Sequence, residues 1–125
     1  MGHGDELVLA DGNFPKFAHP QHVVRCDGHG IPELLSAILQ LMPLDSYVDY
    51  PVILMDVLPG DPYVPTIWKD YRAVIDQYAL KSNQEQAINK FDFYERAQKA
   101  YAVVTTSETA LYANMILKKG VVTVE

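Results

Sequence analysis

The stretch Val52-Ile53-Leu54-Met55-Asp56-Val57 is nearly all apolar and lies between Pro51 and Pro59-Gly60. A short apolar run with turn residues at both ends is typical of a strand that is buried on both faces, as in parallel sheets. On either side of it, residues 31–42 and 67–78 carry apolar side chains at helical spacing. The chain therefore alternates strand and helix around this run.

The same alternation extends to both ends of the chain. Apolar or β-branched runs predict further strands at 6–10, 23–25, 101–105, 115–117 and 121–124. A third helix is expected over 93–100, and the polar stretch 81–86 is expected to be a loop. The length of 125 residues suits one hydrophobic core. We expect a single compact α/β domain over 1–125, with a mainly parallel sheet flanked by helices.

Composition narrows the classes of partner. With 10 basic and 16 acidic residues the formal net charge is −6, which disfavours nucleic acid as a partner. No apolar run is long enough to span a membrane, and we expect no membrane association. The single Cys26 cannot form an internal disulfide and no signal-peptide pattern is present, so the expected compartment is the cytoplasm.

The first eleven residues carry a candidate for proton transfer. His3 stands between two glycines and is followed by an apolar strand that ends at Asp11. Histidine titrates near neutral pH, so an unhindered imidazole on a rigid element suits acid–base chemistry. The alternative for this segment alone is a turn histidine in solvent.

Separated motifs in one order resemble the RbsD/FucU family, and most closely its L-fucose mutarotase branch. They are the His-Gly-Asp-Glu opening, Arg25–Gly28, Pro43–Tyr47, Phe93–Ala100 and Leu111–Val121. The resemblance implies an isomerase that needs no cofactor or metal and interconverts the α and β pyranose anomers of L-fucose or a related monosaccharide. It also implies a homo-oligomer, typically a decameric ring, with sites completed across subunit contacts.

The resemblance also implies roles for particular residues. His3 matches the proton donor to the ring oxygen, and Asp45 could be the second proton-transfer group. The expected substrate-binding residues are Asp11, Met55, Tyr94, Tyr112 and Asn114. Carboxylates and amides suit sugar hydroxyls, a tyrosine ring can lie along a sugar face, and Met55 could line a pocket for the methyl group of a 6-deoxy sugar. The plainer alternatives are turn or capping aspartates, core aromatics and core packing of Met55.

Three other interpretations remain open. A ribose pyranase belongs to the same family, although Phe93-Tyr94-Glu95-Arg96 favours the fucose branch. The chain could also be a sugar-binding or assembly module without catalysis. His19 and His22 have a zinc-like spacing, but Pro20 between them precludes a regular helix, and no metal is expected.

The resembling proteins carry a helical segment before the Met-Gly-His motif, where this chain starts. We therefore expect a domain without that helix. A catalytic group so near a terminus frays unless other contacts hold it. The same expectation strengthens the case for a non-catalytic module.

Overall fold

Strand β1 (Glu6–Ala10) has buried side chains on both of its faces. Leu7 and Leu9 point into one hydrophobic cluster, whereas Val8 and Ala10 point into another. Successive side chains of a strand face opposite sides, so this alternation requires a covering layer on each face. The strand therefore lies inside the sheet of a three-layer domain.

The computed structural model describes residues 1–78 and 84–122. In this part of the chain, six strands form one sheet in the order β2-β5-β1-β6-β3-β4. The other strands are β2 (His22–Cys26), β3 (Val52–Met55), β4 (Glu85–Ile88), β5 (Ala102–Thr106) and β6 (Met115–Lys118). Strand β6 runs antiparallel to both of its neighbours, and the other pairs are parallel. The prediction of an α/β domain with a mainly parallel sheet is confirmed.

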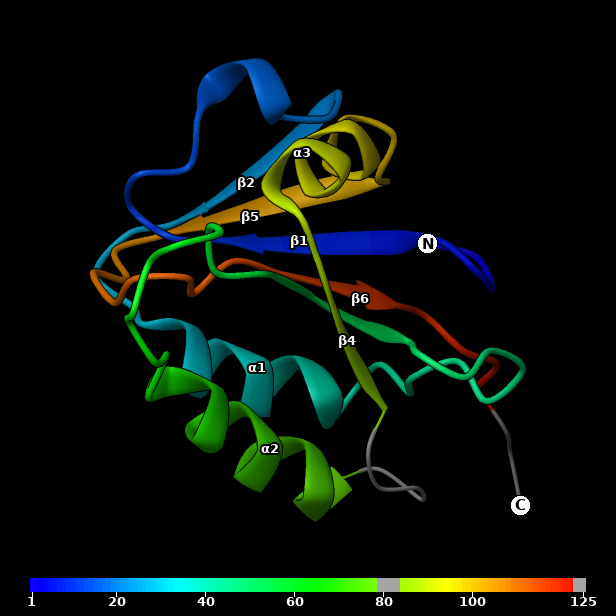
Figure 1. The fold of residues 1–125 in the computed structure, drawn as a ribbon. Coiled ribbons are helices and arrows are strands. Elements are labelled where there is room, and N and C mark those ends of the chain that lie inside the picture. The colour runs from blue at the N-terminus through cyan, green and yellow to red at the C-terminus, as the bar shows by residue number, and fades with distance from the viewer. Residues whose placement is uncertain (79–83, 123–125) are drawn as a thin grey trace.

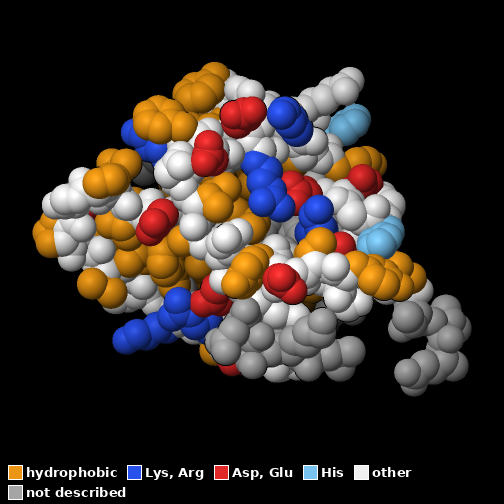
Figure 2. Space-filling model, turned by 45° about the vertical axis from the view of Figure 1, so that its right-hand side comes forward, with side chains coloured by type: hydrophobic (Ala, Val, Ile, Leu, Met, Phe, Trp, Pro, Cys, Tyr) orange, Lys and Arg blue, Asp and Glu red, His pale blue; other side chains and the backbone are white. Residues whose placement is uncertain are grey.

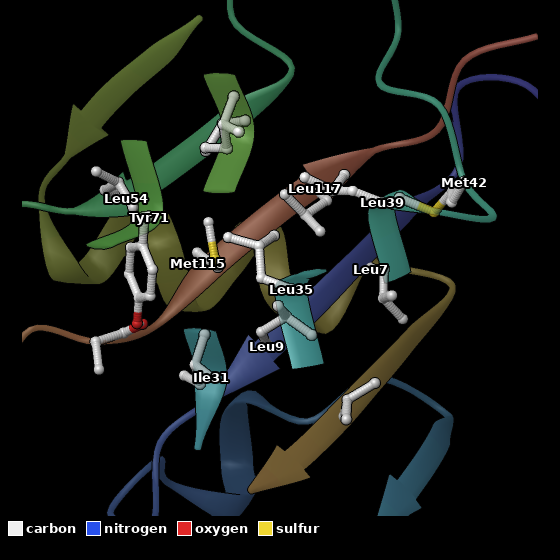
Figure 3. Packing of buried hydrophobic residues seen from close by; sticks show 14 of the residues in the cluster. Leu7, Leu9, Ile31, Leu35, Leu39, Met42, Leu54, Tyr71, Met115 and Leu117 are labelled. Atoms are coloured by element: carbon white, nitrogen blue, oxygen red, sulfur yellow. The ribbon is translucent and has the colours of Figure 1, made fainter. Parts of the chain in front are cut away.

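Helices cover the two faces of the sheet unequally. Helices α1 (Ile31–Leu39) and α2 (Ile67–Tyr78) lie together on one face (Figure 1). Helix α3 (Lys90–Gln98) and the short 3-10 helix η1 (Lys16–Ala18) cover the other. Figure 3 shows the larger core, in which side chains of α1 and α2 pack over those of β1, β3 and β6. The helical spacing of apolar residues predicted α1 and α2, and a third helix was expected over 93–100, whereas η1 was not predicted.

Helix α3 is fixed by polar contacts at both of its ends. At its start, the Asn89 side chain accepts a hydrogen bond from the Asp92 backbone N–H, which caps the helix. Near its end, Arg96 Nε and Nη2 donate to the two carboxylate oxygens of Glu6 on β1, at 2.9 and 2.6 Å. Such a two-pronged pair fixes direction as well as distance. It sets the position of the helix face that carries Tyr94.

The structure differs from the sequence-based prediction at several places. Helix α1 ends at Leu39, although the helical spacing extends to residue 42. Residues 85 and 86, expected in a loop, belong to β4, and 81–83 lie outside the described residues. Residues 121 and 122 are not in a strand, and 123–125 are not described. Helix α3 begins at Lys90, three residues before the expected start, because Asn89 provides the cap.

Candidate active site

One edge of the sheet gathers most of the predicted substrate-binding residues. Asp11 directly follows β1, Met55 ends β3, and Asn114 directly precedes the antiparallel β6. The carboxyl ends of parallel strands meet at one edge, which is where open α/β sheets bind ligands. A pocket of about 290 Å³ opens here, and Tyr94 and Tyr112 line it together with these three residues.

Asp11 and Asn114 are joined across the adjacent strands. Asn114 Oδ1 accepts the Asp11 backbone N–H at 2.7 Å, so the amide NH₂ of Asn114 is left as a donor. Asp11 Oδ1 accepts the Asn13 backbone N–H at 2.9 Å. Burial raises the pKa of Asp11, with a further rise from the charge of Glu108, and these outweigh the lowering by hydrogen bonds from Asn13 and Asn114. A carboxylate in this state is a stronger base than one in water.

The opposite wall of the pocket is apolar and aromatic. Met55 is 6% exposed and packs in the smaller core while also lining the pocket, and its contact with a sugar methyl group stays a prediction. Tyr94 meets Phe14 edge-on, with ring centroids 5.6 Å apart. Burial, and then the charge of Asp11, raises the pKa of the Tyr94 hydroxyl, which therefore stays protonated at neutral pH. This wall suits the apolar face of a small ring.

Several pocket residues were not singled out from the sequence. They are Asn13, Phe14, Leu58, Asp61, Lys90 and Leu111. Asp61 comes from the long connection between β3 and α2, and its sequence context, Pro59-Gly60-Asp61-Pro62, signals only a turn. Lys90 is the first residue of α3. It was missed because the helix was expected to begin only at residue 93.

His3 and Asp45 form a pair at the other edge of the sheet. His3 Nε2 lies 3.1 Å from Asp45 Oδ1, and the imidazole is 5.3 Å from the Tyr47 ring. Asp45 is 4% exposed, and its Oδ1 also accepts the Tyr47 backbone N–H. Burial alone would raise the pKa of Asp45, but the Tyr47 N–H, His3 and the charge of Lys118 lower it below its usual value. Asp45 is therefore a buried carboxylate that orients an exposed imidazole.

Backbone contacts hold this pair in place close to the chain start. The Gly4 N–H donates to Lys119 O at 2.8 Å, and the Asp45 N–H donates to Lys118 O at 3.0 Å. Both acceptors lie at the end of β6 or just beyond it. The segment that carries His3 is thus attached to the sheet, which answers the expectation of fraying.

The length of β1 keeps the two groups apart. His3 precedes this five-residue strand and Asp11 follows it. At about 3.3 Å per residue, five residues span roughly 16 Å, which exceeds the size of a monosaccharide. Figure 1 shows the N-terminus at one end of the sheet and the turn after β1 at the other. One chain therefore does not bring His3 and Asp45 to the pocket that holds Asp11, Tyr94, Tyr112 and Asn114.

A larger groove of about 620 Å³ lies beside the His3 edge. Its lining includes Glu6, Arg96 and Lys118, which contact one another as ion pairs. Both of these ion pairs involve Glu6, whereas the smaller pocket is lined by all five predicted substrate-binding residues.

Exposed hydrophobic side chains surround the mouth of the smaller pocket, which holds Asp11, Tyr94, Tyr112 and Asn114. Phe17 is 67% exposed, Phe91 73% and Leu111 55%, and each lines this pocket or the groove next to it. On the face drawn in Figure 2, hydrophobic side chains gather toward the left, and mixed charges lie nearer its centre. Large exposed apolar residues around a pocket are typical of a contact surface.

Neither a group of metal ligands nor a membrane-spanning helix is present among the residues that the structure describes. His19 stacks on Phe14 at 5.9 Å. Within 1–78 and 84–122, no group of three or more His, Cys, Asp or Glu side chains is placed to hold a metal ion. No helix in these ranges is long and apolar enough to cross a bilayer.

Known proteins are similar to this chain over almost its whole length. The chain is 48% identical to the fucose mutarotase of Bos taurus over 97% of its length and 82% of the relative's. It is 43% identical to the L-fucose mutarotase of Actinobacillus pleuropneumoniae serotype 5b (strain L20), covering all of this chain and 87% of that protein. Among solved structures, the fucose mutarotase from Streptococcus pneumoniae in complex with L-fucose superposes with a TM-score of 0.93 at 53% identity, covering 98% of this chain and 87% of that one. A profile of the RbsD / FucU transport protein family matches residues 1–122, and the chain belongs to this family.

Proposed function

We propose that this protein is an L-fucose mutarotase whose active site is completed by two copies of the chain. Relatives named fucose mutarotase support the substrate, and one solved relative holds L-fucose. The observation that carries the shared site is the separation of the His3–Asp45 pair from the sugar pocket by the length of β1. A neighbouring copy that places its His3 edge over the pocket mouth would unite the two groups.

The proposed reaction opens and recloses the pyranose ring. His3 of one copy donates a proton to the ring oxygen while a pocket carboxylate removes the proton of the anomeric hydroxyl. The bond between the anomeric carbon and the ring oxygen breaks, giving the open-chain aldehyde, and reclosure on the other face returns both protons. Asp45 Oδ1 accepts from His3 Nε2–H, so the other ring nitrogen, Nδ1, is the one that exchanges the proton with the sugar. Asp11 is our candidate for the base because its pKa is raised.

The assembly that we propose is a closed homo-oligomer. Contacts between two different patches of one chain generate rings when the rotation closes. The His3 edge and the pocket mouth are such patches, and the exposed Phe17, Phe91 and Leu111 would be covered in the contact. A decameric ring, as in the family pattern, is one such assembly. We also place the protein in the cytoplasm, where a chain with the single Cys26 needs no disulfide.

Saturation-transfer NMR of anomer exchange tests this function. Catalytic amounts of the protein should accelerate exchange between the two L-fucose pyranose anomers, and should act less on D-ribose. Binding of L-fucose without acceleration would favour the non-catalytic module, and a preference for D-ribose would favour the pyranase. Light scattering coupled to size exclusion measures the assembly. A 14.0 kDa species with full activity would exclude the shared site.

A further inference from the structure

Two side chains of α2 donate hydrogen bonds to the backbone carbonyls of Tyr112 and the next residue, Ala113. Trp68 Nε1 donates to Tyr112 O at 2.9 Å, and Tyr71 Oη donates to Ala113 O at 2.6 Å. Tyr112 itself has a φ of +57°, a left-handed conformation that non-glycine residues seldom adopt. Surrounding contacts must maintain such a backbone, and here they direct one side chain into the pocket wall.

The side chain of Tyr112 is fixed by the connection between β3 and α2. Its hydroxyl donates to Asp61 Oδ2 at 2.5 Å and accepts the Leu58 backbone N–H at 3.3 Å. Its ring stacks on Tyr63, with centroids 5.9 Å apart. Asp61 Oδ1 accepts the Tyr63 backbone N–H at 2.9 Å, which orients the carboxylate. Every polar group of this contact has a defined direction.

The hydrogen-bonding capacity of the Tyr112 hydroxyl follows from these contacts. A phenol has one proton to donate and two lone pairs that accept. The hydroxyl donates its proton in a hydrogen bond to Asp61 and accepts the Leu58 N–H on one lone pair. One acceptor position of the Tyr112 hydroxyl is therefore left. The Asp61 carboxylate likewise has only acceptor positions left. The Tyr112 hydroxyl and the Asp61 carboxylate can therefore accept hydrogen bonds from a ligand and cannot donate any.

We propose that Asp61 is a substrate-positioning residue, which accepts the hydrogen bond of the Tyr112 hydroxyl and thereby leaves Tyr112 as an acceptor for one hydroxyl group of the sugar. The inference rests on the proposed function, because it takes the monosaccharide to lie in this pocket. The donors lie elsewhere in the pocket, on the Asn114 amide and the Lys90 ammonium. A hydroxyl facing Tyr112 therefore donates, and one facing Asn114 or Lys90 accepts.

Electrostatics agree with this division of roles. The hydrogen bond from Tyr112 lowers the pKa of Asp61, and the Tyr63 N–H lowers it further. The same bond to Asp61 raises the pKa of Tyr112. The proton therefore stays on the phenol across the neutral range, and the direction of the bond does not reverse.

Monofluorinated L-fucoses test the proposal, because fluorine in place of a hydroxyl cannot donate a hydrogen bond. Calorimetry would give the affinity of L-fucose and of its fluoro analogues for the parent, Asp61→Ala and Tyr112→Phe. In the parent, fluorine at one ring position should weaken binding by about tenfold, the effect of losing one good hydrogen bond. In both variants that penalty should fall to about twofold or less.

Asp56→Asn is the matched control, since Asp56 is an exposed carboxylate of the same connection that accepts its neighbour's N–H and does not line the pocket. It should retain the parent's penalty. An unchanged penalty in Asp61→Ala, with an unchanged melting temperature, would overturn the proposal. A penalty lost in Asp61→Ala and kept in Tyr112→Phe would show that Asp61 binds the sugar directly, which also overturns it.

Tyr112→Phe keeps the proposal testable should Asp61→Ala fail to fold, because a penalty that persists there excludes Tyr112 as the acceptor. Anomer exchange by the parent is measured separately. Position-dependent fluorine penalties without accelerated exchange would exclude the mutarotase and leave the role of Asp61 supported. A parent that does not bind L-fucose would overturn both.

Discussion

Replacing Tyr71 with Phe should destabilise the protein through a single carbonyl group. Tyr71 is 1% exposed, and its hydroxyl donates to Ala113 O, while Ala113 is fully buried. Phenylalanine keeps the ring in the core but leaves this acceptor without a partner. A buried polar group left unpaired costs about 1–3 kcal/mol. We therefore expect a loss of about 2 kcal/mol in the free energy of unfolding.

Urea unfolding at fixed protein concentration measures this loss. With a slope of about 2 kcal/mol per molar urea, a loss of about 2 kcal/mol lowers the midpoint by about 1 M at unchanged slope. Tyr78→Phe is the matched control on the same helix, because its hydroxyl pairs at 3.2 Å with Ser36 Oγ in a half-buried position that water can reach. The control should change stability by less than about 0.5 kcal/mol. Equal midpoints for the two variants would refute the role given to the Ala113 carbonyl.

Three further substitutions test other parts of the structure. His3→Ala should abolish accelerated anomer exchange in the NMR assay and leave the melting temperature unchanged, whereas the control His29→Ala, at an exposed histidine, should change neither. Exchange at the parent rate in His3→Ala would remove His3 from the mechanism. Asp11→Asn should weaken sugar binding and raise the urea midpoint at pH 7. The raised folded-state pKa of Asp11 gives stability that is present below about pH 3.8 and is lost as pH rises through the folded pKa, so the ionised carboxylate destabilises the fold at pH 7. A higher midpoint of the variant that persists below pH 3.8 would contradict this. Gly120→Ala should lower both the urea midpoint and the rate of anomer exchange, since its Cβ would lie 2.6 Å from Leu44 O and displace the backbone next to Asp45. Parent values of both would show that this backbone shifts without cost.

The interior of the sheet could be predicted from sequence because burial leaves a periodic record. The expected strand 6–10 coincides with β1, and the apolar run at 52–57 contains β3. Strand β4 left no such record. Its sequence, Glu85-Gln86-Ala87-Ile88, is short and half polar, as suits an edge strand that has a neighbour on one side only. The capping pattern Asn89-x-x-Asp92 did mark the start of α3 and could have been used.

The candidate site divides in the same way. The family resemblance implied Asp11, Tyr94, Tyr112 and Asn114, and the fold places them in one pocket, although their roles remain predictions. The contribution of Asp61 could not be foreseen, because it depends on the eleven-residue connection 56–66 contacting a tyrosine 51 positions later in the chain. Periodicity carries no information about such contacts.

The shared site is the central claim, and mixed oligomers test it most directly. His3→Ala lacks the donor at one edge, and Asp11→Asn lacks the base at the other, so each variant alone should be inactive. The two would be co-expressed with different tags, and oligomers carrying both tags purified and assayed for L-fucose anomer exchange. In a random equal mixture about one quarter of the sites combine two intact halves, so about one quarter of the parent activity per site should return. If purified mixed oligomers show no activity beyond that of the separate variants, the donor and the pocket do not meet across a subunit contact.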